Sequence, residues 1–201
     1  MKIDKLLIAS NNLHKIKEIS EILAPLNIKI LSLKDFPEFP DVEETGSTLE
    51  ENSLLKAKEI YEKFKISTLA DDTGLFVDAL NGEPGVYSAR YSGENATYAS
   101  NCEKLLLNLK DIDGKDRTAT FTSVLCLYVN ETEHYFFKGN VEGRIIKQAK
   151  GSNGFGYDPL FIPKGFAKTY AEMDDVKKNE LSHRALALKK FKKFLLKRQN
   201  I

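Results

Sequence analysis

The sequence predicts an α/β protein with a mixed β-sheet flanked by helices, and two observations lead to this class. The apolar run Leu6–Ala9 is typical of a short buried strand, and after a polar turn apolar residues recur at helical spacing from Leu13 until Pro25. Further along, Thr118–Val129 and His134–Ile146 are two long β-type runs with a short polar break between them, which indicates an antiparallel hairpin. A strand followed by a helix is typical of parallel pairing, whereas a hairpin pairs its strands antiparallel. The two features together therefore predict a mixed sheet.

A second helix is expected after a loop that is rich in proline and acidic residues, Phe36–Gly46. Ser47 and Thr48 each have a glutamate three residues further on, which is the capping-box pattern of a helix start. The pattern continues to about Phe64. The segment therefore predicts a capped helix that follows a surface loop.

The middle of the chain predicts two strands and a third helix. The strand Ile66–Ala70 is expected to end in a turn at Asp71–Gly74, because glycine permits a sharp bend of the backbone. A second strand is expected over Leu75–Leu80. Thr97 is expected to cap a helix that reaches Leu109.

Towards the C-terminus, the glycine-rich loop Gly151–Gly156 leads to a short strand, Pro159–Ile162, and then to a helix. Two starts for this helix stay open. A cap at Ser182 would place His183 in the first helical turn. A start near Asp174 would leave His183 opposite the apolar stripe, where it could be exposed.

Composition limits the classes of function. The 201 residues fit one domain, with room for two lobes. Thirty Lys and Arg against 29 Asp and Glu argue against a general nucleic-acid binder or a polybasic membrane binder. Cys102 and Cys126 form neither a disulfide framework nor a metal-ligand pattern, and no apolar run has the length of a membrane span. We therefore expect a soluble cytoplasmic protein that binds neither nucleic acid nor membrane.

The segment Ser10–Lys15 (Ser-Asn-Asn-Leu-His-Lys) lies between the first strand and the first helix. The first turn of that helix carries His14 and Lys15, with no carboxylate before Glu18. Cations at the positive end of a helix are stabilised if an anion lies between them, so the serine hydroxyl, backbone N–H groups and the lysine would converge on a phosphate. A capped helix with a solvated lysine is the alternative.

Two acidic segments could supply oxygen ligands. Asp71 and Asp72 follow a buried strand, where a carboxylate could hold Mg²⁺ or take a proton from water. Adjacent strand residues point to opposite faces, so at most one of the pair is expected to face the site. A structural Asx-type turn is the alternative. The acidic segment Glu43–Gly46 is weaker evidence by itself, since such loops are usually solvated.

Two later segments could recognise a base or a phosphate. The loop Gly151–Pro159 combines three glycines with two aromatic side chains, so a base could stack on Phe155. The alternative is a structural turn whose aromatic rings lie in the core. In Lys177–Arg184, the planar fork of Arg184 suits a phosphate or a keto oxygen.

Five segments occur together in an order that makes chance unlikely. Ser10–Lys15 matches the [ST]-x-N-x-x-K pattern. The other four are Glu43–Gly46 with Glu51–Ala57, Ala70–Leu75 with Pro84–Tyr91, Gly154–Pro159, and Ser182–Arg184. From about Lys5 to Leu195 the chain resembles the inosine/xanthosine triphosphate pyrophosphatases, the Ham1-like proteins. It departs from their pattern at Asn11, where glycine is common, and at Thr73, where serine is common.

This resemblance implies an elongated mixed β-sheet flanked by helices, two lobes with an active-site cleft between them, and a homodimer. It also implies an enzyme that uses Mg²⁺ to hydrolyse non-standard purine nucleoside triphosphates, namely ITP, dITP and XTP, to the monophosphate and pyrophosphate. Such an enzyme cleanses the nucleotide pool, so that deaminated purines are not incorporated into DNA or RNA.

The family's roles carry over to matching positions of this chain. Asp72 is implied as the general base or metal-linked carboxylate, and Glu43 as the second acidic residue at the metal. Whether Glu43 or its neighbour Glu44 assists the metal stays open. Arg184 and backbone N–H groups near Phe155–Tyr157 would donate to the 6-keto oxygen of the base. The full set of implied substrate contacts is Ser10, Asn11, Asn12, Leu13, His14, Lys15, Lys56, Thr73, Phe155, Gly156, Tyr157, Asp158, Lys178, His183 and Arg184.

Two rival functions are considered. A related group of nucleotide pyrophosphatases opens with a similar motif and prefers pyrimidine or modified nucleotides, but the Gly154–Pro159 and Ser182–Arg184 segments argue against it. A non-catalytic nucleotide sensor would keep the pocket and lose turnover. The intact carboxylates Asp72, Glu43 and Glu44 disfavour that reading.

Overall fold

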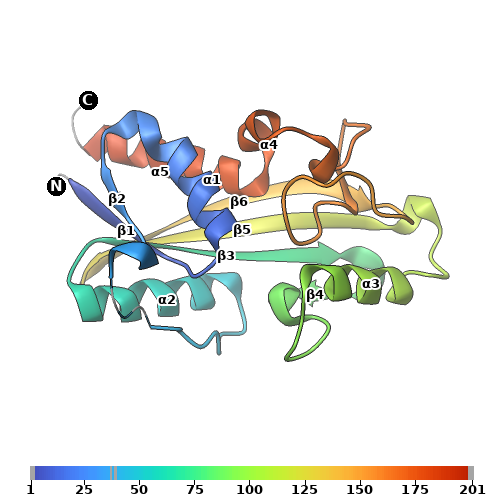
Figure 1. The fold of residues 1–201 in the computed structure, drawn as a ribbon, viewed down its shortest axis with the longest axis horizontal. Helices are drawn as coiled ribbons and strands as arrows, with labels where there is room; N and C mark the ends of the chain where they lie inside the picture. The colour runs from blue at the N-terminus through green and yellow to red at the C-terminus, as the bar shows by residue number, and fades with distance from the viewer. Residues whose placement is uncertain (1–2, 37, 39, 199–201) are drawn as a thin grey trace. The chain divides into compact units, whose positions relative to one another are not determined.

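The computed structural model describes residues 3–198 except residues 37 and 39 (Figure 1). Pro37 and Phe39 of the predicted proline-rich loop therefore lie outside the described residues. The chain forms two compact units. The first consists of Met1–Asp72, Ser123–Gly139 and Arg184–Ile201, and the second of Thr73–Thr122 and Asn140–His183.

The strands form one seven-stranded sheet in the order β2-β1-β3-β5-β6-β7, with β4 paired to β3. Its strands are β1 (Lys5–Ala9), β2 (Lys29–Leu31), β3 (Thr68–Val77), β4 (Pro84–Gly85), β5 (Thr118–Asn130), β6 (Glu133–Ile145) and β7 (Phe161–Pro163). The helices are α1 (Leu13–Leu23), α2 (Leu49–Phe64), α3 (Tyr98–Asn108), α4 (Asp175–Leu181) and α5 (His183–Arg198). The predicted α/β class and the mixed sheet are confirmed.

The sheet is mixed because its two ends pair differently. β1 pairs in parallel with β2 on one side and with β3 on the other. β5 and β6 are neighbours joined by only two residues, a connection that permits antiparallel pairing alone. β7 also pairs antiparallel, with Arg144 of β6 opposite Ile162. The predicted hairpin is therefore present.

The order of the first three strands gives the first unit its two layers of helices. α1 leads from β1 to β2 on one side, and α2 leads from β2 back to β3 on the other side of β1. Because such crossovers are right-handed, the reversal places the two helices on opposite faces of the sheet. In Figure 1, α1 and α5 lie on one side of β1 and β3, and α2 lies on the other. In sheets of this kind, ligands bind beyond the carboxyl ends of strands at the point where the strand order reverses. Here that point is the end of β1 at Ala9, opposite Ala70 of β3, which itself continues to Val77.

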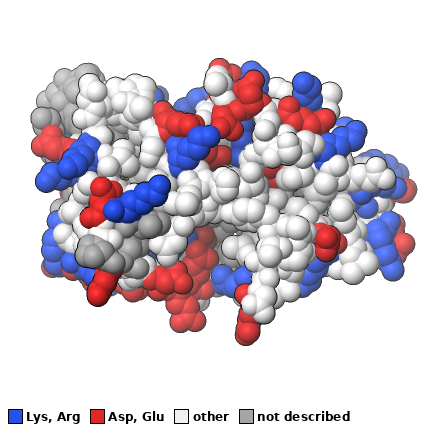
Figure 2. Space-filling model, viewed as in Figure 1, with Lys and Arg blue, Asp and Glu red and all other residues white. Residues whose placement is uncertain are grey.

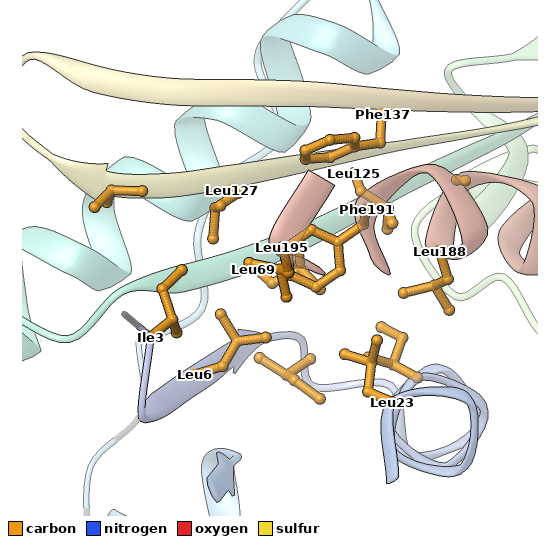
Figure 3. Close-up of a cluster of buried hydrophobic side chains, with 14 residues drawn as sticks. Ile3, Leu6, Leu23, Leu69, Leu125, Leu127, Phe137, Leu188, Phe191 and Leu195 are labelled. Atoms are coloured by element: carbon orange, nitrogen blue, oxygen red, sulfur yellow. The ribbon is translucent and has the colours of Figure 1, made fainter. Parts of the chain in front are cut away.

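Each face of the first unit buries its own hydrophobic cluster. The cluster under α1 and α5 includes Leu6 and Leu69, with Phe191 of α5 packed among them (Figure 3). The cluster under α2 includes Ala70 of β3 and Ile60 of α2. Neighbouring residues of β3 thus alternate between the two clusters, as the period of two in a strand requires.

The second unit has a separate core. Its buried residues come from the strands β3, β5, β6 and β7, from α3 and from loops, and they include Leu75, Leu105, Phe121 and Phe161. α3 starts with a full capping box, in which Thr97 and Ser100 exchange hydrogen bonds. The cap predicted at Thr97 is therefore confirmed.

The predicted turn at Asp71–Gly74 is wrong, because β3 runs without a break from Thr68 to Val77. Gly74 serves another purpose. A Cβ atom on it would lie 2.6 Å from the backbone oxygen of Gly85 on β4, so the glycine permits β4 to approach β3 closely. Gly74 is not among the glycines with positive φ. A close approach of backbones, rather than a bend, explains the residue.

Both predicted starts of the C-terminal helix are partly correct, because there are two helices. α4 is capped by Asp174, whose side chain accepts from the Lys177 N–H. Ser182 ends α4 in an extended conformation, and α5 begins at His183. His183 is only 3% exposed, so the alternative that left it on the surface is wrong.

Candidate functional site

The loop after β1 forms a compact helix cap. The Ser10 Oγ accepts a hydrogen bond from the Asn12 N–H at 3.1 Å. The Asn12 Oδ1 in turn accepts from the N–H groups of His14 at 3.0 Å and Lys15 at 3.3 Å, at the start of α1. The first turn of α1 contains no acidic residue. The positive end of the helix dipole is therefore not offset by a carboxylate of its own first turn.

Asp71 lies at the centre of a buried charge cluster. Its Oδ2 is 2.9 Å from the Lys15 Nζ and accepts from the Arg184 Nη2 at 2.9 Å. The Ser123 hydroxyl donates to its Oδ1 at 2.5 Å. Burial alone would raise the pKa of Asp71, but Arg184 and Lys15 outweigh it and hold the pKa well below its usual value. Arg184 also donates to Glu18 of α1. Asp71 is therefore a charged anchor for three other segments of the first unit.

Asp72 makes a different set of contacts. Its Oδ1 is 3.0 Å from the Lys56 Nζ, and the same ammonium is 2.6 Å from the Glu44 Oε1. Burial raises the pKa of Asp72, and Lys56 and Lys15 only partly offset this, while Glu44 adds to it. Within the described part of the chain, the buried Asp72 Oδ2 has no hydrogen-bond partner. Asp72 thus has one oxygen available to a ligand, and its raised pKa means that it binds a proton more readily than a free carboxylate does.

The two aspartates differ because they point to opposite faces of β3. Leu69 belongs to the cluster under α1 and α5, and Asp71 follows it on that face. Ala70 belongs to the cluster under α2, and Asp72 follows it there. The two side chains therefore lie on different faces of β3, and the expectation that at most one of them faces the site stays a prediction.

Lys15 and Lys56 meet at one backbone oxygen. Both Nζ atoms donate to the Asp71 carbonyl, at 3.3 Å from Lys15 and 3.1 Å from Lys56. One lysine comes from α1 and the other from α2. The alternative of a solvated Lys15 is wrong, because this side chain is only 15% exposed. Two ammonium groups therefore lie together just past the carboxyl end of β1, beside the interior of β3.

The charge balance of this cluster suits a divalent cation. Its cationic side chains are those of Lys15, Lys56 and Arg184, and its carboxylates are those of Glu18, Glu44, Asp71 and Asp72. The carboxylates exceed the cations by one, so a polyphosphate would meet a net negative charge without an added cation.

Among the described residues, no three His, Cys, Asp or Glu side chains form a metal-binding group by themselves. Mg²⁺, however, is commonly held by one or two carboxylates together with substrate phosphates and water. The Asp72 carboxylate, with its unpartnered Oδ2, and the neighbouring Glu44 carboxylate provide such a donor set. The residues present fit the ion.

A second cluster lies in the second unit, around the glycine-rich loop. The Lys178 Nζ is 2.6 Å from the Asp158 Oδ2 and 4.7 Å from the centre of the Phe155 ring. The same carboxylate oxygen accepts from the Phe155 N–H at 2.8 Å. Lys178 and Asp158 are both buried. The contacts between them hold the ring of Phe155 in a defined place, as a stacking surface requires.

Two further hydrogen bonds connect the glycine-rich loop to the rest of the second unit. The Tyr157 hydroxyl donates to the Ser88 carbonyl at 2.9 Å, and the Cys102 thiol of α3 donates to the Gly156 carbonyl. Tyr157 is buried, whereas Phe155 is only half-buried. The structural alternative for this loop is therefore correct for Tyr157, and Phe155 keeps an accessible surface.

His183 and Arg184 are adjacent in sequence but belong to different units. The His183 ring stacks on Phe121 with centroids 4.5 Å apart and an interplanar angle of 7°. Arg184 is bound to Asp71 and Glu18 and is 1% exposed. These contacts give Arg184 a structural role that the sequence did not predict, and its reading of the base stays a prediction.

A cavity of about 740 Å³ also lies in the second unit. None of its lining residues belongs to either cluster; they include Asp78, Thr118, Glu142, Arg144 and Lys164.

The remaining predicted site residues are exposed or half-buried, and their roles stay predictions. Asn11, Leu13 and His14 are exposed. Glu43 is exposed as well, and it is the neighbouring Glu44 that contacts Lys56. Thr73, which follows Asp72 on β3, is half-buried.

Sequence reasoning missed four residues of the first-unit cluster, namely Glu18, Glu44 as the inner acid, Asp71 as an anchor, and Ser123. Asp71 could have been found, because a charged residue that continues a buried strand needs partners. Ser123 and Arg184 could not have been matched to it, since they lie 52 and 113 residues further along the chain.

The family model described as Ham1 family matches residues 6–194 of this chain. The chain belongs to the Ham1 family. It is 47% identical over 192 residues to the dITP/XTP pyrophosphatase of Oceanobacillus iheyensis, an alignment that covers 95% of this chain and 98% of that protein. The relative of the same name from Listeria monocytogenes serovar 1/2a is also 47% identical over 192 residues, covering 96% of this chain and 95% of that protein.

Solved structures of Ham1 proteins have the same fold. The Ham1 protein of Staphylococcus aureus superposes with a TM-score of 0.85 at 41% identity, covering 96% of this chain and 99% of that chain. The HAM1 protein of Coxiella burnetii gives a TM-score of 0.88 at 41% identity, covering 98% and 100%. The resemblance found in the sequence motifs is therefore confirmed, and so is the fold class.

Proposed function

We propose that this Ham1 protein hydrolyses non-standard purine nucleoside triphosphates, namely ITP, dITP and XTP, to the monophosphate and pyrophosphate. The names of its relatives, dITP/XTP pyrophosphatases, support this reaction. The same reaction in the cell would remove deaminated purines from the nucleotide pool.

One observation carries the proposal most directly. Lys15 and Lys56 meet beside Asp72 of β3, where the neighbouring strand β1 ends, next to the capped start of α1. Phosphoryl chemistry asks little covalent work of a protein and depends on positioning and charge neutralisation. Two lysines and the N-terminus of a helix supply both for a polyphosphate.

We propose Mg²⁺ as the cofactor, held by Asp72 and Glu44. Sequence resemblance pointed to Glu43, but Glu43 is exposed while Glu44 shares Lys56 with Asp72. When bound, the ion would neutralise phosphate charge and polarise the phosphorus–oxygen bonds.

The residues of this chain would then act as follows. Asp72 would accept a proton from the attacking water, and its burial favours this because it increases proton affinity. Lys15 and Lys56 would hold phosphate oxygens, and Ser10 with Asn12 would keep the start of α1 in place beside them. Water would attack the α-phosphorus, so that the bond to the pyrophosphate group breaks.

For base selection we propose the cluster of the second unit. Phe155 would stack on the purine, and backbone N–H groups near Phe155–Tyr157 would donate to the 6-keto oxygen together with Arg184. Lys178, whose ammonium lies 4.7 Å from the centre of the Phe155 ring, is a further candidate donor. Adenine presents a donor at that position, so a donor would face a donor and both would stay unpaired. Sites that recognise polar groups in this way can discriminate by about 10⁴-fold.

A product assay tests the reaction. The protein would be incubated with Mg²⁺ and inosine, xanthosine, adenosine, guanosine and pyrimidine triphosphates, and pyrophosphate and orthophosphate would be measured separately. We expect pyrophosphate from the two 6-keto substrates and a loss of at least about 100-fold in the Asp72→Asn variant. Release of orthophosphate alone would mean attack at a terminal phosphorus and would contradict the proposal.

The same assay separates the enzyme from its two rivals. A nucleotide sensor would bind the triphosphates and release no pyrophosphate. A member of the pyrimidine-preferring group would release pyrophosphate mainly from pyrimidine substrates. Leaving out Mg²⁺, or adding a chelator, is expected to abolish turnover if the proposed cofactor is correct.

Three properties stay predictions: a homodimer, which the resemblance implies, and a cytoplasmic location and the absence of nucleic-acid and membrane partners, which the composition implies. Light scattering on the purified protein would test the dimer. No helix in the described part of the chain has the length and apolar character needed to cross a membrane.

A further inference from the structure

We infer that Asn52 is a positioning residue for Glu44, and that it acts by holding the backbone of the acidic loop at Gly46. The inference rests on the proposed function, because Glu44 matters only if the Asp72–Glu44 pair takes part in the reaction. Among the described residues, the Asn52 side chain bonds to Gly46, and its Nδ2 has no hydrogen-bond partner, so Asn52 makes no hydrogen bond to Asp72.

Asn52 makes one short side-chain contact with the loop. Its Oδ1 accepts a hydrogen bond from the Gly46 N–H at 2.7 Å. A backbone N–H needs an acceptor, so this bond fixes which end of the Asn52 amide faces the loop. A Cβ on Gly46 would lie 2.6 Å from that Oδ1 and 2.7 Å from the Glu51 Cβ. Loop and helix therefore meet so closely that only a glycine fits.

The remainder of the Asn52 side chain has no comparable polar role. The side chain is fully buried, and its Nδ2 has no hydrogen-bond partner among the residues described. An unsatisfied buried donor costs about 1–3 kcal/mol. A residue that only filled space at such a position would be apolar. The bond to Gly46 is what accounts for an amide here.

The position of Asn52 on α2 links this bond to the site. Asn52 and Lys56 are four residues apart, so they lie on the same face of the helix, one turn from each other. Asn52 holds the loop backbone at Gly46, and Lys56 binds the Glu44 carboxylate, two residues before Gly46. The loop is thus held at two points of one helix face, and Glu44 is directed to the ammonium that also contacts Asp72.

The tests use two variants of Asn52 and one matched control. Asn52→Ala removes the acceptor, and Asn52→Asp keeps an acceptor oxygen of nearly the same geometry. Ser53→Ala is the control, because Ser53 is equally buried on α2 and its hydroxyl bonds to the Glu50 carbonyl instead of the loop.

The first readout needs no turnover. Exchange of the Gly46 amide hydrogen, followed by NMR, is expected to be about tenfold faster in Asn52→Ala than in the native protein. It should stay slow in Asn52→Asp and in Ser53→Ala. An unchanged rate in Asn52→Ala would overturn the inference whatever the enzyme does with nucleotides.

The second readout is a double-mutant cycle on kcat/KM with inosine triphosphate. Asn52→Ala should lower kcat/KM about tenfold in the native background, while Asn52→Asp should recover most of it and Ser53→Ala should change it less than twofold. In a Glu44→Gln background, Asn52→Ala should have almost no further effect. An equal loss in both backgrounds would overturn the inference, because Asn52 would then act independently of Glu44.

If Asn52→Ala does not fold, Gly46→Ala displaces the loop from the other side of the same contact and enters the same cycle. If the native protein releases no pyrophosphate at all, the proposed function fails. Amide exchange then still reports whether Asn52 holds the loop.

Discussion

At the scale of the residue, two neighbouring carboxylates differ in their contacts because successive side chains of a β-strand point to opposite faces of the sheet. Asp71 is charged and fully engaged with Lys15, Ser123 and Arg184, whereas Asp72 keeps a buried oxygen without a partner. The sequence places both at the end of a buried strand and predicts that at most one faces the site. The family resemblance, and not the strand pattern, implies that this residue is Asp72, because the partners that distinguish the two carboxylates come from distant segments.

These different contacts lead to opposite expectations for two similar substitutions. Asp71→Asn removes the negative charge between two buried cations, and we expect it to lower the free energy of unfolding by about 3 kcal/mol. Asp72→Asn removes a carboxylate that burial disfavours, so its free energy of unfolding should stay within about 1 kcal/mol of the native value while its turnover collapses. Urea denaturation of both variants measures the difference. Equal losses of stability would contradict the assignment of Asp71 as the structural anchor.

At the scale of the element, the strand β3 is where the structure differs from the sequence-based prediction. The glycine in Asp71–Gly74 suggests a turn, since glycine usually marks one in a sequence. In the structure the strand continues, because β4 pairs with β3 at Leu75 and Phe76 and needs the space beside Gly74. The capped helices were easier to predict. Their capping residues, Thr48 and Thr97, bond to backbone N–H groups three residues away, so the pattern does not depend on distant parts of the chain.

A pair of glycine substitutions tests this reading of β3. Gly74→Ala would bring a methyl group within 2.6 Å of the Gly85 carbonyl oxygen, and we expect a loss of about 1–3 kcal/mol of stability. Gly114→Ala is the control, since a Cβ there would meet nothing within 4 Å and its φ is not positive. It should leave the stability unchanged or raise it by up to about 1 kcal/mol. Thermal denaturation followed by circular dichroism compares the two. Equal midpoints of thermal denaturation for the two variants would mean that β4 can shift away from β3 at little cost, and that the close approach is not required.

At the scale of the whole molecule, charge balance separates this protein from nucleic-acid binders that handle the same bases. The net charge is +1, and positive and negative side chains are interspersed over the face drawn in Figure 2. Affinity for a polynucleotide grows with the number of phosphates neutralised, so it requires an extended positive field. Here the buried cations lie in clusters together with carboxylates.

We therefore expect no binding to single-stranded DNA tighter than about 10⁻⁴ M at physiological salt. Fluorescence anisotropy of a labelled oligonucleotide measures this, with a triphosphate-binding assay on the same sample as the positive control. Micromolar affinity that falls steeply with added salt would contradict the expectation and would point to a basic surface away from both clusters.

The family and the order of elements could be predicted at this scale, because five motifs lie in sequence order along the whole chain. The composition of the two units could not. The first unit is assembled from three separated segments of the chain, and the charge cluster around Asp71 takes residues from all three. No local pattern shows that Ser123 and Arg184 meet at Asp71.

The distance along the chain between Asp71 and its partners sets an order in time. Ser123 is made 52 residues after Asp71, and Arg184 113 residues after it. At a synthesis rate of about 5–20 residues per second, the ribosome reaches the arginine roughly 6 to 23 s after the aspartate. Until then, this buried carboxylate lacks the guanidinium that holds its Oδ2 in the folded protein. A nascent chain therefore holds an incomplete charge cluster through most of its synthesis, and the first unit can close only after α5 has left the ribosome.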